Sequence, residues 1–91
     1  MIHFEVEVRT SARRHGIADP DIHHAIDNAV AAGPVETNVD QILGVLYIGP
    51  DRTGRMLEVI TVDDVDDGEV VIHAMKLRKA YERYLPREDR S

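Results

Sequence analysis

The sequence predicts an α+β fold in which two helices pack on an antiparallel sheet of three to four strands. Three observations lead to this prediction: an alternating segment at the start of the chain, one strongly amphipathic helical segment, and three consecutive apolar segments separated by turn residues. Because short turns join the apolar segments, we expect them to pair as a sequential meander. With 91 residues, the chain is long enough for one domain and too short for two.

The first two elements are a strand and a helix. Residues 2–8 alternate between apolar and polar side chains, which indicates a half-buried strand, and the short turn after it is expected to end at Gly16. A helix is then expected to begin at Asp19, where the carboxylate can cap it and the next residue is proline. Apolar residues recur at helical spacing over residues 22–30. The Gly-Pro pair that follows is expected to stop the helix, and residues 35–41 to form a polar loop.

Three strands are predicted next. Residues 42–48 are almost continuously apolar, which is typical of a central strand covered on both faces. Residues 49–54 form a turn, and residues 56–62 form the second strand. The acidic turn at residues 63–68 ends in Asp-Gly, a pair that favours chain reversal, and leads into the third strand at residues 70–75.

A second helix is predicted at the end of the chain. Apolar residues at helical spacing extend from Leu77 to Leu85, and Pro86 terminates the pattern. Residues 1–86 are therefore expected to form the single domain, and residues 87–91 a frayed tail.

Composition excludes several classes of function. Without cysteine, the chain has no disulfide, no thiolate nucleophile and no cysteine metal site. No apolar run is long enough to span a membrane and no signal peptide precedes the first strand, so we expect a cytoplasmic protein without a membrane partner.

The charge balance argues against simple, non-specific binding of nucleic acid. Seventeen acids against eleven bases give a net charge of −6. The bases are nevertheless gathered near the two ends of the chain, and Arg52 and Arg55 are the only ones between residues 19 and 69. If the fold brings the two ends together, the protein has one basic face; the alternative is an ordinary solvated surface.

The metal and nucleotide motifs do not support a cofactor. His23 and Asp27 lie one helical turn apart, which suits two metal ligands or a surface ion pair, but no third ligand is in view. The acidic turn lacks the alternating ligands of a calcium loop, and the glycines lack phosphate-binding spacing. We therefore predict neither a metal nor a cofactor.

The remaining cations, imidazoles and one phenol suit metal-free RNA cleavage. This reaction needs a base for the 2′-hydroxyl proton, cations for the phosphate, and an acid for the leaving oxygen. His73, expected to share a strand face with Val71 and Met75, is the candidate for proton transfer. The alternatives are a core-edge histidine bound to a backbone carbonyl and a Tyr81 needed only for packing. The candidate catalytic residues are His73, Arg55, Arg78, Tyr81 and His15. The candidate substrate-binding residues are Arg13, Arg14 and Arg52.

The order of three motifs resembles BrnT-type toxins of the RelE-like ribonuclease group. The segment Arg14-His15-Gly16-Ile17 before an acid-started helix is similar to the family's Lys-His-Gly-Ile/Val segment. Tyr47-Ile48-Gly49 followed by Gly54-Arg55-Met56-Leu57-Glu58-Val59 looks like its hairpin. Val71-Ile72-His73-Ala74-Met75-Lys76 is similar to its Ile-Ile-Ser-Ala-Arg strand. Together the matches extend from Arg13 to Leu85.

The sequence departs from that family at three points. Met75 takes the place of the family arginine, His73 takes the place of the serine, and the Trp-Asp-Glu start is missing. Lys76 and Arg78 are the nearest substitutes for the arginine, and Lys76 and Lys79 complete the predicted substrate-binding residues.

The resemblance implies a metal-independent endoribonuclease toxin of a bacterial type II toxin–antitoxin pair, inhibited by a small, DNA-binding antitoxin. The alternative is a non-catalytic RNA- or protein-binding module on the same scaffold. A ribonuclease requires Arg14 and Arg78 on one face, because a phosphate site needs cations that converge. The RNA target and the oligomeric state stay open.

Overall fold

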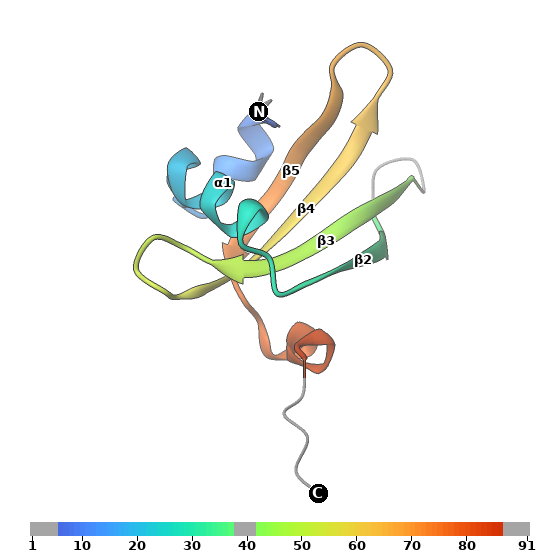
Figure 1. The fold of residues 1–91 in the computed structure, drawn as a ribbon. Helices are drawn as coiled ribbons and strands as arrows, with labels where there is room; N and C mark the ends of the chain where they lie inside the picture. Colours follow the sequence, from blue (N-terminus) through green and yellow to red (C-terminus); the bar gives the residue numbers. More distant parts are fainter. Residues whose placement is uncertain (1–5, 38–41, 87–91) are drawn as a thin grey trace, which may run out of the picture.

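The computed structural model describes residues 6–37 and 42–86, so the predicted tail and most of the predicted first strand lie outside the described residues. Within that part, a five-stranded mixed sheet carries one α-helix and two 3₁₀ helices, which confirms the α+β class (Figure 1). The elements are, in order, β1 (Glu7–Val8), η1 (Thr10–Arg13), α1 (Asp19–Asp27), β2 (Ala31–Glu36), β3 (Leu43–Pro50), β4 (Met56–Asp64), β5 (Gly68–Lys76) and η2 (Lys79–Tyr84). None of the helices in these two ranges has the length and hydropathy of a membrane-spanning segment.

The sheet contains the predicted meander and two further strands. Its order is β1-β5-β4-β3-β2. β2 pairs antiparallel with β3, β3 with β4, and β4 with β5. The prediction of a purely antiparallel sheet of three to four strands is wrong, because β1 pairs parallel with β5 and β2 forms the opposite edge. β1 can run parallel to β5 because the chain leaves it through η1 and α1 and completes the meander before returning to the same edge.

The edge strand β2 occupies residues that the sequence assigned to a helix end and a loop. The Thr37 N–H donates to the Ile42 carbonyl, and residues that bond to a neighbouring strand alternate along an antiparallel strand. Val35 and Gly33 therefore direct their backbone groups toward β3. Pro34 therefore faces away from the ladder, where its missing N–H costs no hydrogen bond. Its position also blunts an exposed sheet edge.

Helix α1 begins at the predicted residue but is shorter than predicted. It ends at Asp27, and Val30, which was expected on the buried stripe, is 47% exposed. Asp19 does not cap the helix; the N-cap is Ala18, and the Asp19 carboxylate instead accepts a bond from Arg13 at 2.7 Å. Ile22 and Ala25 are fully buried against one face of the sheet, so α1 has the predicted apolar stripe over its first two turns.

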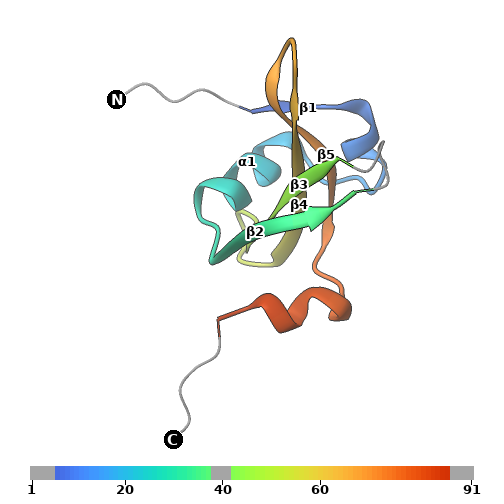
Figure 2. The same ribbon diagram turned by 90° about the vertical axis from the view of Figure 1, so that its right-hand side faces the viewer.

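The predicted C-terminal helix is a 3₁₀ helix on the other face of the sheet. η2 has no buried residue, and Ala80 and Tyr84 of its expected stripe are exposed. Leu77, Tyr81 and Leu85 are half-buried against a second cluster formed by β3 and β4, apart from the core under α1. Figure 2 shows η2 lying beyond the sheet from α1. The tight 3₁₀ turn does not stack residues 77, 81 and 85 as an α-helix would, so they pack only partly.

Candidate functional site

A groove of about 1000 Å³ follows the η2 face of the sheet and contains half of the predicted site residues. Its floor is apolar and comes from β4 and β5, at Ile60, Val62, Val70 and Ile72. The turn after η1 contributes Arg14 and His15, β5 contributes His73, and the segment through η2 contributes Arg78 and Tyr81. We call this feature the η1–η2 groove. Arg14 and Arg78, 64 positions apart in sequence, line it together.

A β-bulge directs His73 into the groove. In the pairing of β4 with β5, Ile60 lies opposite His73, whereas the next residue, Thr61, lies opposite Val71, so that one extra residue stands on β5. Val71 and Ala74 both pack in the core under α1, and the two residues between them line the groove or contact its floor. The prediction that His73 shares a face with Val71 is therefore wrong, since strict alternation breaks at the bulge.

Glu58 on β4 binds both the His73 imidazole and the Arg78 guanidinium. Its side chain is completely buried, and its Oε2 atom accepts bonds from His73 Nε2 at 2.9 Å, Arg78 Nε at 3.0 Å and Arg78 Nη2 at 2.7 Å. Its Oε1 atom accepts the backbone N–H of Arg78 at 2.9 Å. Burial raises the pKa of Glu58, but the hydrogen bonds from Arg78 and His73 outweigh burial and lower it below its ordinary value. The carboxylate is therefore ionised at neutral pH.

The charge of Glu58 determines the tautomer of His73. A carboxylate can only accept hydrogen bonds, so Nε2 of His73 carries the proton that lies between the two groups. In the neutral ring the free electron pair is then on Nδ1, which can take a proton. His73 keeps 24% of its side chain exposed, and its partner is a carboxylate rather than the backbone carbonyl of the structural alternative.

A second imidazole lies against the first. The rings of His15 and His73 are 5.7 Å apart between centroids and meet edge to face. The hydroxyl of Ser11 in η1 donates to the Ile72 carbonyl at 3.1 Å, which ties this end of η1 to the bulged strand. Tyr81 also lines the groove, and the centroid of its ring is 5.3 Å from the Arg78 guanidinium carbon. His15, His73 and Tyr81 thus bring three proton-exchanging groups into one groove.

Three of the predicted arginines do not join this groove. Arg13 pairs with Asp19, Arg52 pairs with Asp21 at 2.8 Å, and Arg55 lies 3.5 Å from Asp51. Each forms an ion pair with a carboxylate of α1 or of the β3–β4 turn. The other predicted bases, Lys76 and Lys79, are exposed where β5 leads into η2 and do not line the groove.

Asp51 explains why Arg55 belongs to a turn rather than to the site. The Asp51 carboxylate is buried, and it accepts the Thr53 hydroxyl at 2.7 Å and the backbone N–H groups of Thr53 and Arg55 at 2.8 and 2.9 Å. The Thr53 bond, with the backbone bonds, outweighs burial and lowers the pKa of Asp51 to about 2. Arg55 extends from this closed turn and stays largely exposed.

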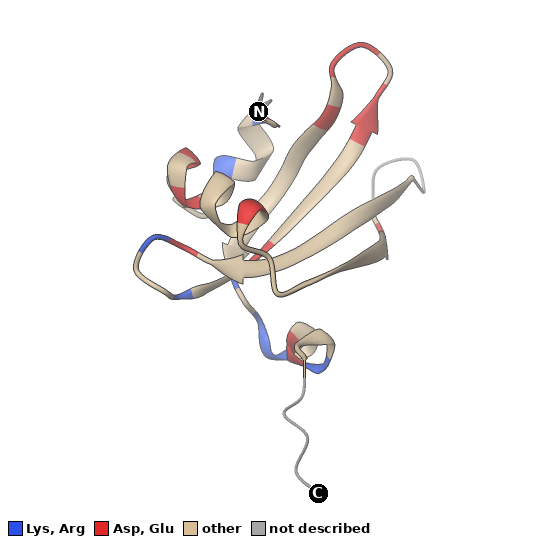
Figure 3. Cartoon of the chain, in the orientation of Figure 1, with Lys and Arg blue, Asp and Glu red and all other residues tan. Residues whose placement is uncertain are grey.

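The far end of the groove is bordered by the ends of β2 and β4. It is lined by Glu36 at the end of β2 and by Asp63 and Asp64 at the end of β4. Figure 3 shows the acids gathered at the β4–β5 turn and the bases where β5 leads into η2. Arg9 also lines the groove, but its guanidinium lies within 3.6 Å of carboxylate oxygens of Glu7, Asp64 and Asp67. By strand alternation Asp64 shares the groove face with Val62, whereas Asp63 shares the opposite face with Glu69, so the charges that face this end of the groove are those of Asp64 and Arg9.

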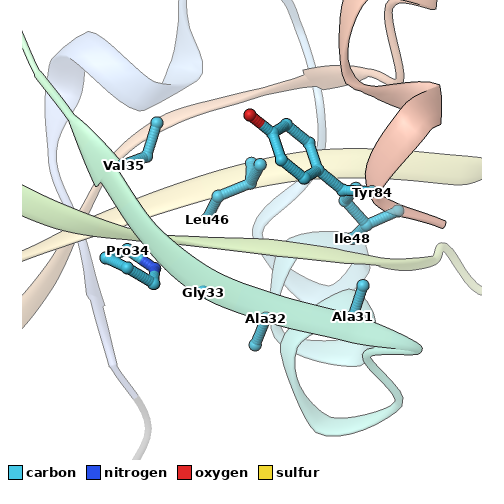
Figure 4. A pocket seen from close by; sticks show the side chains of 8 residues that line it. All are labelled: Ala31, Ala32, Gly33, Pro34, Val35, Leu46, Ile48 and Tyr84. Carbon is cyan, nitrogen blue, oxygen red and sulfur yellow. The ribbon is translucent and has the colours of Figure 1, made fainter. Parts of the chain in front are cut away.

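A second pocket offers little chemistry. It measures about 350 Å³ and lies between β2, β3 and Tyr84 of η2. Figure 4 shows the Tyr84 ring over Leu46 and Ile48, and Tyr84 supplies the only titratable side chain of its lining. Polar groups that converge mark a functional site, so we assign the candidate site to the η1–η2 groove.

Sequence reasoning missed Glu58, the residue that organises the site. A lone acid within the apolar strand 56–62 was the available signal, because a buried carboxylate requires a partner. Within residues 6–37 and 42–86, no group of three or more His, Asp or Glu side chains is arranged to hold a metal ion.

Comparisons with protein-family models, with curated proteins and with solved structures give no match for this chain. The resemblance to BrnT-type toxins therefore rests on the sequence motifs alone.

Proposed function

We propose that this protein is a metal-independent endoribonuclease and that the η1–η2 groove is its active site. The observation that carries the proposal is the His73–Glu58 pair: a buried, ionised carboxylate orients an imidazole whose other nitrogen can accept a proton. A second imidazole, His15, lies against it, and Arg14 and Arg78 line the same groove. Two imidazoles and two guanidinium groups thus line one open groove, which supports the proposal because phosphodiester cleavage by protein side chains requires an acid, a base and cations.

The proposed reaction assigns one step to each imidazole. His73 takes the proton of a ribose 2′-hydroxyl at Nδ1, and the 2′-oxygen attacks the adjacent phosphorus. The bond from phosphorus to the 5′-oxygen breaks, and His15, in its protonated form, gives that oxygen a proton. The products are a 2′,3′-cyclic phosphate and a free 5′-hydroxyl, so that no water is consumed. Arg14 and Arg78 offset the charge that builds on the phosphate oxygens.

Glu58 supports this chemistry as a positioning residue. It fixes the tautomer of His73 and stabilises the imidazolium after proton transfer, because the carboxylate stays charged. It also holds Arg78 at the groove through three bonds, while about half of the Arg78 side chain stays exposed.

The direct test is cleavage of a mixed-sequence RNA by purified protein in the presence of a chelator, with and without translating ribosomes. His73→Gln keeps an N–H donor for Glu58 but cannot accept the proton, so we expect cleavage to fall about a hundredfold or more with unfolding midpoint preserved. His23→Gln on α1, outside the groove, is the matched control and should cleave like the wild type. An inactive wild type, or an active His73→Gln variant, would contradict the proposal.

The proposed partner is a small antitoxin, in keeping with the resemblance to BrnT-type toxins. Inducing this chain in a bacterial host is then expected to arrest growth, and co-expressing a neighbouring gene that encodes a small DNA-binding protein should relieve the arrest. Arrest that persists with His73→Gln would separate toxicity from cleavage and contradict a ribonuclease toxin.

The second candidate function is a non-catalytic RNA- or protein-binding module. It is favoured by the pairing of Arg78 with Glu58 and by the net charge of −6, both of which weaken the groove as a phosphate site. Binding of RNA or of the neighbouring protein by a wild type that never cleaves RNA would support this candidate over the enzyme.

A further inference from the structure

We propose that the apolar pocket between β2, β3 and η2 binds a base of the RNA substrate, beside the η1–η2 groove that receives the phosphate. This inference rests on the proposed function and deepens it, because it assigns a second part of the substrate to a second cavity. It makes unpaired RNA the substrate class, since only an unstacked base can enter a pocket. It follows from the lining of the pocket, from its place next to the groove and from the charge beside it.

Small residues leave the space of this pocket open. Ala31 and Gly33 of β2 lie opposite Ile48 and Leu46 of β3, on the face of the sheet that η2 covers. A Cβ on Gly33 would meet nothing within 4 Å. A cavity of about 350 Å³ therefore remains between the strands and the ring of Tyr84 (Figure 4). Sites for small molecules begin at about this size.

The base is the part of an RNA that suits this lining. None of the described residues around the pocket is charged, and the Tyr84 hydroxyl already accepts a bond from Arg83 Nη2 at 3.0 Å. A phosphate or a ribose would lose its hydrogen bonds with water there. A base instead has a π-face, which stacks on an aromatic ring whatever the identity of the base. We therefore expect binding without a strong preference for sequence.

Two tyrosine rings connect the pocket to the groove. Tyr81 lines the groove, Tyr84 lines the pocket, and the centroids of their rings are 6.1 Å apart. Aromatic rings in contact lie at such distances. The Arg78 guanidinium, which lines the groove, lies 5.3 Å from the centroid of the Tyr81 ring. An RNA strand with its phosphate at Arg78 therefore has a neighbouring base close to the pocket.

Arg83 places a positive charge beside the ring of Tyr84. Its guanidinium carbon is 5.0 Å from the centroid of that ring. Within residues 6–37 and 42–86 Arg83 forms no ion pair with a carboxylate, so its charge is available to the phosphate of a bound nucleotide. Proteins that bind single-stranded nucleic acid combine these two features, an aromatic ring for the base and a cation for the backbone.

The test measures binding of two probes by fluorescence anisotropy: a twelve-nucleotide 2′-O-methyl RNA, which cannot be cleaved, and an abasic chain of the same length. Ala31→Leu fills the pocket from β2, so we expect the Kd for the RNA to rise about tenfold and the Kd for the abasic chain to stay unchanged. The matched control, Ala80→Leu, adds the same side chain at an exposed position of η2 that lines neither cavity, and should bind both probes like the wild type.

A second variant removes the stacking ring without filling the pocket. Tyr84→Leu keeps an apolar side chain at a position that is 47% exposed, so the unfolding midpoint should be preserved. Its Kd for the RNA should likewise rise about tenfold.

These binding measurements keep the base site separate from the proposed cleavage. If the wild type never cleaves RNA but both pocket variants weaken binding of the RNA alone, the base site holds and the ribonuclease does not. If the wild type cleaves RNA but folded pocket variants bind the RNA as tightly as Ala80→Leu, the base site is overturned and the ribonuclease holds. Equal affinity of the wild type for the RNA and the abasic chain, or binding of neither, would also overturn the base site.

Discussion

Glu58 connects the proposed cleavage chemistry to stability at the level of a single residue. Its carboxylate acts only as an acceptor, and the donors are His73 Nε2, Arg78 Nε and Nη2, and the Arg78 backbone N–H. This position therefore requires a side chain that accepts hydrogen bonds at both of its terminal atoms, as a carboxylate does. It is also completely buried, so water cannot replace a lost partner.

Glu58→Gln tests this requirement. Whichever way the amide turns, its NH₂ group meets a donor, so we expect the free energy of unfolding to fall by about 1–3 kcal/mol in urea denaturation. Glu82→Gln, an exposed glutamate in η2, is the control and should change it by less than about 0.5 kcal/mol. A Glu58→Gln variant as stable as this control would show that the carboxylate is not needed as a double acceptor.

The tautomer of His73 gives a second measurement of the role of Glu58. In the wild type, nitrogen-15 NMR should find the neutral ring protonated at Nε2, since that nitrogen donates to Glu58. Glu58→Gln should release the ring into a mixture of tautomers, and cleavage should fall even where the protein is folded. A ring protonated at Nδ1 in the wild type would contradict the assignment of His73 as the base.

At the level of the elements, the contact between α1 and β3 depends on a glycine. A Cβ on Gly49 would meet the backbone oxygen of Ala25 and approach the Ala29 Cα atom to 3.0 Å. These are main-chain atoms, which cannot rotate away as a side chain would. The absence of a side chain at Gly49 thus allows α1 to pack closely on the sheet.

Gly49→Ala should therefore lower the free energy of unfolding by about 3 kcal/mol or more. Gly33→Ala is a matched control within β2, where a Cβ would meet nothing within 4 Å and the backbone does not require glycine. There we expect no loss, and a gain of up to about 1 kcal/mol, because alanine restricts the unfolded chain. Similar values for the two variants in urea denaturation would rule out close packing at Gly49.

At the level of the whole molecule, paired carboxylates make stability depend on acid. Hydrogen bonds to the charged form lower the pKa of several acids, namely Asp19, Asp21, Asp51, Glu58 and Asp64. The folded state then binds fewer protons than the unfolded state does. The stabilisation is complete above the ordinary carboxyl pKa and is lost as the pH falls through the lowered values.

We therefore expect the unfolding temperature to fall steadily from about pH 5 to about pH 2. Asp51→Asn keeps an oxygen that can accept the Thr53 and Arg55 bonds but cannot titrate, so its curve should be flatter below about pH 4 than that of the wild type. Differential scanning calorimetry across this range measures both curves. Parallel curves would show that Asp51 does not contribute to the acid sensitivity.

The sequence by itself determined the order and type of most elements. Local signals were sufficient for the start of α1 at Asp19 and for the turns at Gly16 and Gly68, which have φ values of +76° and +72°. The three meander strands likewise followed from apolar runs separated by turn residues. Such signals act within a few residues, so they can be read along the chain.

The tertiary structure decided where each strand pairs and which side chains meet. Pro34 was assigned to a helix stop, and only the sheet gave it an outward edge position where a proline is tolerated. His73 was assigned to the face of Val71, and only the bulge in β5 moved it to the groove beside Glu58. Arg55 and Arg78 look alike in sequence, but Asp51 holds the former in a turn and Glu58 holds the latter in the groove. These outcomes depend on contacts between residues far apart in the chain, and alternation or spacing along one segment cannot specify them.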